Sequence, residues 1–188
     1  MPPNYLNMMK KSSSILFYIK FLLKSSNAHG VHSPFVYDLI TLCLRKKRKK
    51  DILFEKFLDG FPDYFNSKSI QVLNDLILYL KTKNYYSVTE EKHSFLQLPS
   101  LTKLQKKHPE NSDLIYVSEN NQNIKLLLDL ISNLKQNGLL IFENPYSNKA
   151  LWEEVKNKLD TQIVVDTFYY GLIFNRKQQA KENFKIRI

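Results

Sequence analysis

The sequence predicts an α/β protein whose sheet is mostly parallel, with an antiparallel hairpin near the C-terminus and helices before the sheet. Residues 114–117 and 139–142 are short apolar runs typical of strands buried on both faces, and a stretch with helical periodicity separates them. The apolar runs 163–165 and 172–174 flank Tyr169-Tyr170-Gly171, which indicates a hairpin. Strands that alternate with helices favour parallel pairing through crossover connections.

The N-terminal part is expected to be helical. A first helix over about residues 12–25 would dock an apolar stripe on the core, formed by Ile15, Leu16, Ile19, Leu22 and Leu23. Attachment to a membrane surface is the alternative, whereas a span is excluded because the apolar stretch is short and Lys20 interrupts it. Ser33 can cap a second helix that has Pro34 at its first position, and residues 51–58 continue as helix.

The remaining elements follow from periodicity. Helices are expected over 69–80, 99–107, 124–134 and 152–159, and a short strand over 85–88. Asn137-Gly138 is expected to close the helix that begins at Ile124. We expect two parts, an N-terminal helical extension over residues 1–66 and an α/β domain over residues 67–188.

The chain is basic, with a formal net charge of +10 over 188 residues. Part of the excess is an unbroken run, the basic run, formed by Arg45, Lys46, Lys47, Arg48, Lys49 and Lys50. Such a run could neutralise nucleic-acid phosphates or could be a solvated helix end, and both readings stay open. Cys43 is the only cysteine, so we expect an inert buried thiol and a cytoplasmic protein.

Glycine is scarce. The chain has four, and none stands in a glycine-rich turn between a strand and a helix. A cofactor's phosphate, ribose or carboxylate approaches backbone N–H groups closely where side chains are missing. The fold is therefore easier to predict than an activity.

Two segments carry a resemblance to a known family. The first is 27–40, which reads NAHGVHSPFVYDLI, and the second is 166–188, which contains DTFYYGLIF and ends in FKIRI. They resemble a bacterial group of class I S-adenosylmethionine-dependent methyltransferases of the O-methyltransferase-like type. The resemblance implies a Rossmann-like, methyltransferase-like sheet of reduced size, with S-adenosylmethionine as the cofactor if the donor site survives.

The central motifs depart from that family. Where its first strand ends in a glycine turn, residues 84–93 contain no glycine, and we expect the second strand with its ribose-binding acid to be deleted. Ser118-Glu119-Asn120-Asn121 stands in place of Asp-Gly-Asn-His, and Glu143-Asn144 in place of Asp-Asp. The degenerate cofactor positions implied by the resemblance are Ser87, Glu119, Glu143 and Asn144. No metal site is expected, because Ser118 replaces the first carboxylate.

Candidate catalytic residues are His29 and His32, three positions apart in a turn, either of which could act as a general base. The competing interpretation makes both part of the turn's structure. Asp166 and Tyr170 could line a pocket or stabilise the hairpin.

The sequence therefore favours a degenerate relative of the methyltransferases that lacks methyl transfer and keeps a scaffold or partner-binding role. One alternative is an active S-adenosylmethionine-dependent O-methyltransferase with an atypical donor site. Others are a nucleic-acid-binding module that uses the basic run and a purely structural protein whose N-terminal helices pack on a protein partner.

Overall fold

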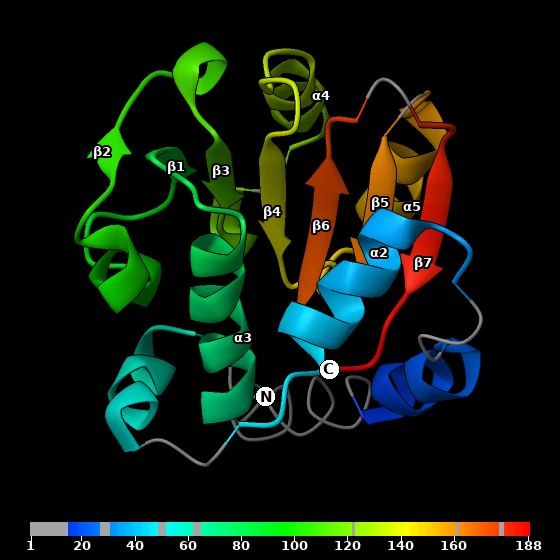
Figure 1. Ribbon diagram of the computed structural model, residues 1–188, viewed down its shortest axis with the longest axis horizontal. Coiled ribbons are helices and arrows are strands. Elements are labelled where there is room, and N and C mark those ends of the chain that lie inside the picture. Colours follow the sequence, from blue (N-terminus) through cyan, green and yellow to red (C-terminus); the bar gives the residue numbers. More distant parts are fainter. Residues whose placement is uncertain are drawn as a thin grey trace, which may run out of the picture.

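A computed structural model describes residues 15–26, 31–48, 52–61, 65–121, 123–160, 162–176 and 179–188. In this part of the chain seven strands form a single sheet in the order β2-β1-β3-β4-β6-β5-β7 (Figure 1). Strands β1, β3 and β4 run parallel, and β6 is inserted antiparallel between β4 and β5. The predicted fold class, a mostly parallel α/β sheet with an antiparallel C-terminal hairpin and N-terminal helices, is confirmed.

The strands are short, and most are fully buried. Their bounds are β1 Asn84–Val88, β2 Gln105–Lys106, β3 Leu114–Val117, β4 Leu139–Glu143, β5 Ile163–Asp166, β6 Tyr170–Phe174 and β7 Glu182–Lys185. Every residue of β3, β4, β5 and β6 is buried, as expected for strands covered on both faces.

Five α-helical segments accompany the sheet in the described residues. They are the helix over residues 15–24, α2 (Pro34–Asp38), α3 (Ser67–Tyr79), α4 (Ile124–Ser132) and, before β5, α5 (Lys149–Lys158). A π-helical stretch, η2 (Leu39–Leu44), continues α2, and a 3-10 helix, η3 (Ile52–Gly60), follows. Among the described residues, no helix combines the length and the apolar character that crossing a membrane would need.

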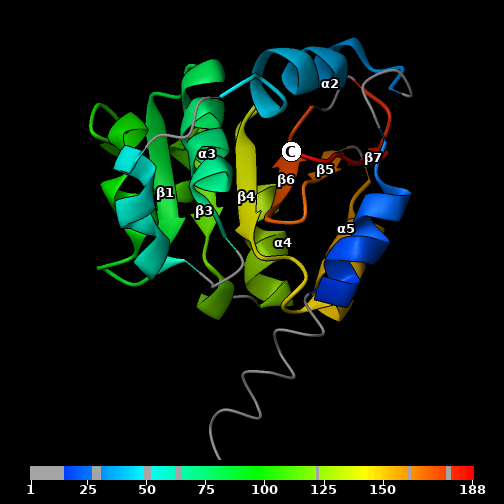
Figure 2. The same ribbon diagram turned by 90° about the horizontal axis from the view of Figure 1, so that it is seen from below.

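Each face of the sheet has its own core, because successive side chains of a strand point to opposite faces. On one face Leu114, Tyr116 and Ile141 pack with the N-terminal helices and α3. On the other, Ile115 and Phe142 pack with α4 and α5. The helices thus form two layers with the sheet between them (Figure 2). Helices from both sides of residue 67 contribute to the first core, and the division there stays a prediction.

The first helix is helical as expected, but its predicted buried stripe is wrong. Ile15, Leu16, Ile19 and Leu23 are 55%, 58%, 48% and 82% exposed, and only Leu22 of the predicted stripe is half-buried. The buried face is instead aromatic and consists of Phe17, Tyr18 and Phe21, which pack on aromatic rings of the C-terminal half. A periodic apolar pattern predicts a helix. It does not identify the buried face of this helix, because two adjacent faces are both apolar.

The second helix begins as predicted, with Ser33 at the N-cap and Pro34 in the first turn. The Ser33 side chain nevertheless makes no capping hydrogen bond, and its hydroxyl is buried without a partner in the described part of the chain. Cys43 is a buried free thiol, as expected, and burial raises its pKa to about 12.

The segment between β1 and β3 differs from the prediction. Residues 99–107 form no α-helix but a short 3-10 turn, η5 (Pro99–Leu101), followed by β2. The second strand is therefore shortened to two residues, paired parallel to β1, and is not deleted. Asn137-Gly138 does not close α4 either, because the C-cap is Asn133. Asn137 instead takes a left-handed conformation, with a φ of 63°, in the turn that leads into β4.

Candidate functional site

Ligands of open α/β sheets bind outside the carboxyl ends of the strands, where the strand order reverses. Here β2 lies on one side of β1 and β3 on the other, so the reversal falls between β1 and β3. These strands end at Val88 and Val117, next to Glu143 at the end of β4. We call this region the carboxyl edge.

The two loops that leave β1 and β3 are tied together across the reversal. The Ser118 N–H donates to the Val88 carbonyl at 3.1 Å, and the Asn121 side-chain amide contacts the same oxygen at 3.4 Å. The Asn120 amide donates to Glu90 Oε1 at 3.2 Å. These bonds join the loop after β1 to the loop after β3.

A histidine lies over the end of β4. His93 Nε2 is 3.3 Å from Glu143 Oε2, which also accepts the Glu119 N–H at 3.0 Å. His93 Nδ1 accepts the Phe95 N–H at 3.2 Å, so Nε2 is the ring nitrogen that donates to the carboxylate. Glu143 is only 1% exposed, and its carboxylate is therefore closed to solvent.

Aromatic side chains pack around this histidine and along the carboxyl edge. We call this set the aromatic cover; it comprises Phe17, Tyr18, Phe21, Phe61, Phe65, Tyr146, Phe168 and Tyr169. The Phe61 ring meets the His93 ring edge-on at 5.3 Å between centroids. Phe168 stacks on Tyr146 at 4.8 Å and meets Tyr18 at the same separation. The N-terminal helix thus closes the edge over the hairpin tip.

The structure brings three of the four predicted cofactor positions together. Glu119 and Glu143 are bonded, and Asn144 follows directly, 4% exposed. The backbone of Asn144 is left-handed, with a φ of 48°, and its side-chain oxygen accepts the Ser147 N–H at 3.2 Å. Ser87 lies within β1, and its hydroxyl is buried without a hydrogen-bond partner in the described residues. Glu119 is half-buried and bonds Glu143 through its backbone N–H, whereas the Glu143 and Asn144 side chains are buried.

The two catalytic candidates are not both described. His29 lies outside the described residues, and His32 is exposed beside the buried Ser33. No hydrogen bond or ion pair of the described residues joins His32 to a carboxylate, so its role as a base stays a prediction.

The residues of the basic run differ in their exposure. Arg45, Lys46 and Lys47 are exposed, whereas the Arg48 side chain is 7% exposed and bonds Asp75 on α3, with Nε to Oδ2 at 2.9 Å. Arg48 also donates to the Leu44 carbonyl at 3.2 Å, which caps the end of η2. Arg48 is therefore a structural residue, and Lys49 and Lys50 lie outside the described residues.

Asp166 belongs to the hairpin. It is 2% exposed and accepts hydrogen bonds from the Phe168 N–H at 3.0 Å and the Tyr146 hydroxyl at 2.9 Å. Burial raises the pKa of this carboxyl against the opposing effect of those bonds. The Tyr170 hydroxyl lies 3.4 Å from the Ser69 carbonyl. Both side chains thus stabilise the hairpin and its contact with α3.

No group of three or more His, Cys, Asp or Glu side chains within the described ranges could hold a metal ion.

Sequence reasoning missed His93 and Phe61. In the sequence, His93 is only the last residue of the glycine-free segment 84–93, and nothing near it in the sequence identifies Glu143 as its partner. The aromatic residues at 17–21, 61–65 and 168–169 are three separate clusters in the sequence, and only the fold brings them to one edge.

Searches with family models and among curated proteins found no match for the chain. Among solved structures, a candidate caffeoyl-CoA O-methyltransferase from Staphylococcus aureus is similar, with 13% identity and a TM-score of 0.46 over 73% of this chain and 97% of the other. A candidate O-methyltransferase from Klebsiella pneumoniae has 10% identity and a TM-score of 0.46 over 71% and 94%.

A third similar structure is a T. Thermophilus 16S ribosomal RNA methyltransferase in complex with AdoMet and guanosine. It has 12% identity and a TM-score of 0.31 over 71% of this chain and 41% of the other.

Proposed function

We propose that this chain is a methyltransferase-like protein that transfers no methyl group and serves as a cytoplasmic scaffold or binds a protein partner. The observation that carries the proposal is the buried pair of His93 and Glu143 at the carboxyl edge. Methyl transfer depends on holding the donor sulfonium in line with a nucleophile, so a chain that cannot seat the donor cannot supply that geometry.

Three features support the proposal independently of the missing glycines. The loops after β1 and β3 bond each other across the strand reversal. Glu143, the acid at the end of β4, already accepts two hydrogen bonds and is 1% exposed. The aromatic cover packs the N-terminal helix onto the hairpin tip. A donor would have to displace all three, and each displacement costs binding free energy.

The test is isothermal titration calorimetry of the intact chain with S-adenosylmethionine and, separately, with S-adenosylhomocysteine. We expect no saturable heat with either ligand up to millimolar concentration. Circular dichroism of the same sample checks that the protein is folded. Saturable binding in the micromolar range would contradict the proposal and would favour the active O-methyltransferase with an atypical donor site.

Nucleic-acid binding is the second candidate, and the exposure of Arg45, Lys46 and Lys47 side by side favours it. Arg48 is excluded from this role because it holds Asp75. Replacement of the three exposed residues by glutamine should lower affinity for single-stranded RNA. The slope of log affinity against log salt should fall by up to about 2, since each phosphate contact on a single strand contributes roughly 0.7.

A matched control keeps the same change in net charge. Lys24, Lys125 and Lys158 are exposed and lie on three other helices, so their triple glutamine variant should leave the salt slope unchanged if the basic run is the site. Equal losses from both triple variants would identify a diffuse charge effect and would remove the basic run as a site.

A further inference from the structure

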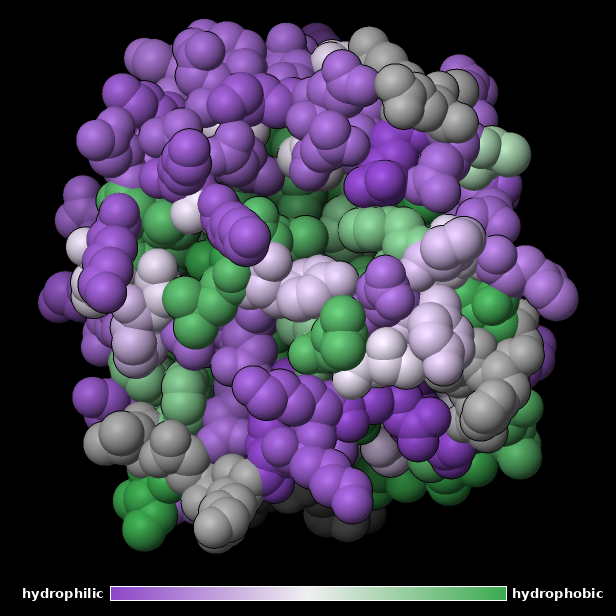
Figure 3. All heavy atoms as spheres, viewed as in Figure 1, coloured by the Kyte–Doolittle hydropathy of each residue, from purple (hydrophilic) through white to green (hydrophobic). Residues whose placement is uncertain are grey.

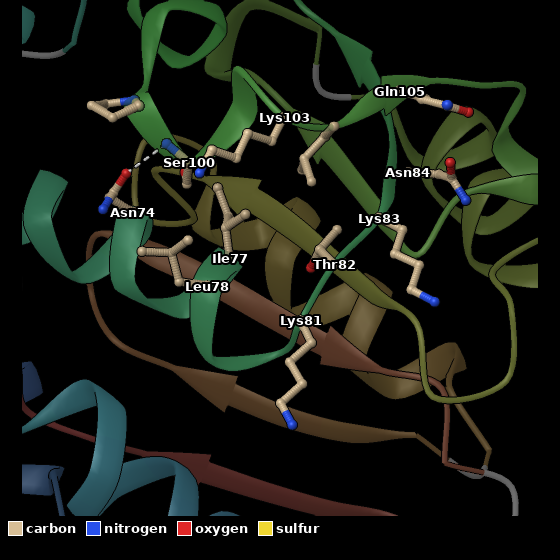
Figure 4. A pocket seen from close by; sticks show the side chains of 12 residues that line it. Asn74, Ile77, Leu78, Lys81, Thr82, Lys83, Asn84, Ser100, Lys103 and Gln105 are labelled. Atoms are coloured by element: carbon tan, nitrogen blue, oxygen red, sulfur yellow. Dashed lines mark hydrogen bonds between the residues drawn. The ribbon is translucent and has the colours of Figure 1, made fainter.

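A cavity lies at the opposite edge of the sheet from the carboxyl edge. It has a volume of about 550 Å³ and lies between the end of α3, the start of β1 and the segment 99–105 (Figure 4). This volume is within the range of small-molecule sites, about 300–1,000 Å³. Its walls are partly apolar, with Ile77 and Leu104 among the lining residues.

Three lysines line the cavity, and no acidic residue is among the lining residues that the structure describes. Lys81 and Lys83 come from the turn between α3 and β1, and Lys103 from the turn before β2. Figure 4 shows the Lys103 side chain extending toward Ser100, with Lys81 and Lys83 on the other side of the cavity. Three ammonium groups around one small volume raise the local concentration of anions.

The nearby negative groups are already neutralised. Asp113 accepts the Lys83 and Asn84 N–H groups at 3.0 and 3.1 Å, and its other oxygen contacts Lys135 Nζ at 2.9 Å. The last carbonyls of α3 are bonded as well, because the Lys81 N–H donates to the Leu78 carbonyl at 3.1 Å. The lysines of the cavity therefore have no described carboxylate that would compete with a bound anion.

The cavity also contains unused hydrogen-bonding capacity. Ser100 is 5% exposed, and its hydroxyl has no hydrogen-bond partner in the described part of the chain. Its backbone N–H donates to Asn74 Oδ1 at 2.9 Å, which fixes both residues in the wall. A buried hydroxyl without a partner is costly and rare in folded proteins. A ligand oxygen in the cavity would satisfy it.

The turn that carries two of the lysines is held in an unusual conformation. Lys81 has a φ of 52°, in the left-handed region that favours glycine or asparagine. A glycine would make this turn without strain, but it would remove one of the three charges.

We propose that this cavity binds a small molecule made of a phosphate monoester and an apolar body. The monoester carries a charge of about −1.5 to −2 at neutral pH and three acceptor oxygens, which complements the positive charge of the lining lysines and the unpartnered hydroxyl of Ser100. The apolar body would lie against Ile77 and Leu104. Because the cavity is at the amino ends of the parallel strands, the proposal is independent of whether the carboxyl edge binds a methyl donor.

Phenyl phosphate is the probe, titrated into the intact chain by isothermal titration calorimetry at low salt. Phenol lacks the anion and inorganic phosphate lacks the apolar body, so each should bind at least about tenfold more weakly. Amide NMR shifts should change at Lys81, Lys83 and Ser100 and should be unchanged at the carboxyl edge. Higher salt should weaken binding, because these lysines are exposed.

Matched variants locate the site. Lys103→Gln should weaken the binding of phenyl phosphate by about threefold, the effect expected from loss of an exposed ion pair. Lys125→Gln on α4 should leave this binding unchanged. Gln105→Glu adds a negative charge to the lining and should weaken binding further, with Gln97→Glu, exposed outside the cavity, as its control. Ser100→Ala should weaken binding without loss of stability, since an unpartnered hydroxyl is removed.

Each outcome of these titrations either supports or overturns the proposed site. Saturable binding of phenyl phosphate that responds to Lys103→Gln and Gln105→Glu, and not to their controls, supports the site. Absence of binding at 10 mM or so, well above the range expected for a site of this volume, overturns it. Binding that is equally sensitive to Lys125→Gln, or equal for phenol and phenyl phosphate, overturns it too.

Discussion

Replacement of His93 by alanine tests the packing of the carboxyl edge. The change removes the imidazole that donates to Glu143 at 3.3 Å and that meets the Phe61 and Tyr116 rings at 5.3 and 5.8 Å between centroids. Glu143 stays in place, 1% exposed, and keeps the Glu119 N–H as a donor. A buried carboxylate would thus lose one of its hydrogen bonds.

The expected cost follows from these contacts. A hydrogen bond to a charged group contributes about 1.5–3 kcal/mol net, and loss of the ring contacts adds about 1 kcal/mol. We therefore expect His93→Ala to lower the free energy of unfolding by about 3 kcal/mol, which for a chain of this size lowers the midpoint of thermal unfolding by roughly 9 °C.

Urea unfolding followed by circular dichroism measures the loss, and a double-mutant cycle isolates the pair. In a Glu143→Gln background the same histidine replacement should cost only about 1–2 kcal/mol, because the side chain at position 143 then carries no buried charge that would lose a hydrogen bond. His108→Ala, an exposed histidine between β2 and β3, is the control and should be neutral. A cost for His93→Ala below about 1 kcal/mol, or equal costs in both backgrounds, would refute the reasoning.

Three further changes test the core and the electrostatics. Gly171→Ala should destabilise the chain by about 3 kcal/mol in urea unfolding, because the new Cβ would lie 2.7 Å from Trp152 Cζ2, a ring that is 1% exposed; a neutral result would show that the ring moves freely. Phe21→Ala should cost about 3–4 kcal/mol and Leu23→Ala less than about 0.5 in the same assay, since these residues of one helix are 3% and 82% exposed; equal costs would contradict the assigned buried face. Burial alone would raise the pKa of Asp113, but bonds from a lysine and two backbone N–H groups outweigh it and lower the pKa, so the stabilisation is present above about pH 4 and lost as pH falls further. Asp113→Asn should flatten this acid loss, and an unchanged pH profile of stability would show that the bonds do not persist in solution.

The core strands were predictable because burial on both faces leaves a direct mark on the sequence. Runs such as Leu114–Val117 and Leu139–Glu143 have almost no polar residue, and this composition suits few alternatives to a central strand. The hairpin was predictable for a related reason, since two apolar runs flank a glycine. Both signals are local.

The predictions that were wrong concerned features that depend on contacts between distant segments of the chain. The sequence could not say which apolar face of residues 15–24 is buried, because that depends on the rings of Tyr146 and Phe168, more than 120 positions away. The two-residue β2 has no apolar pattern, and it exists because Gln105 and Lys106 pair with β1.

Sequence analysis predicted acidic residues of the candidate site but missed the side chain that packs over them. Glu119 and Glu143 were expected at the carboxyl edge, and the structure brings them together. Their partner His93 comes from a turn with no periodic signal, and the cavity lined by Lys81, Lys83 and Lys103 joins two turns that are separated by a strand. Residues in turns are placed by the tertiary fold, so sequence spacing alone does not locate them.

The most direct measurement is a crystal structure of the chain grown with S-adenosylhomocysteine at millimolar concentration. We predict no ligand density beyond the ends of β1, β3 and β4, with the imidazole of His93 still within hydrogen-bonding distance of Glu143. Density for the ligand at that edge, with the histidine displaced and Phe61 moved aside, would contradict the account.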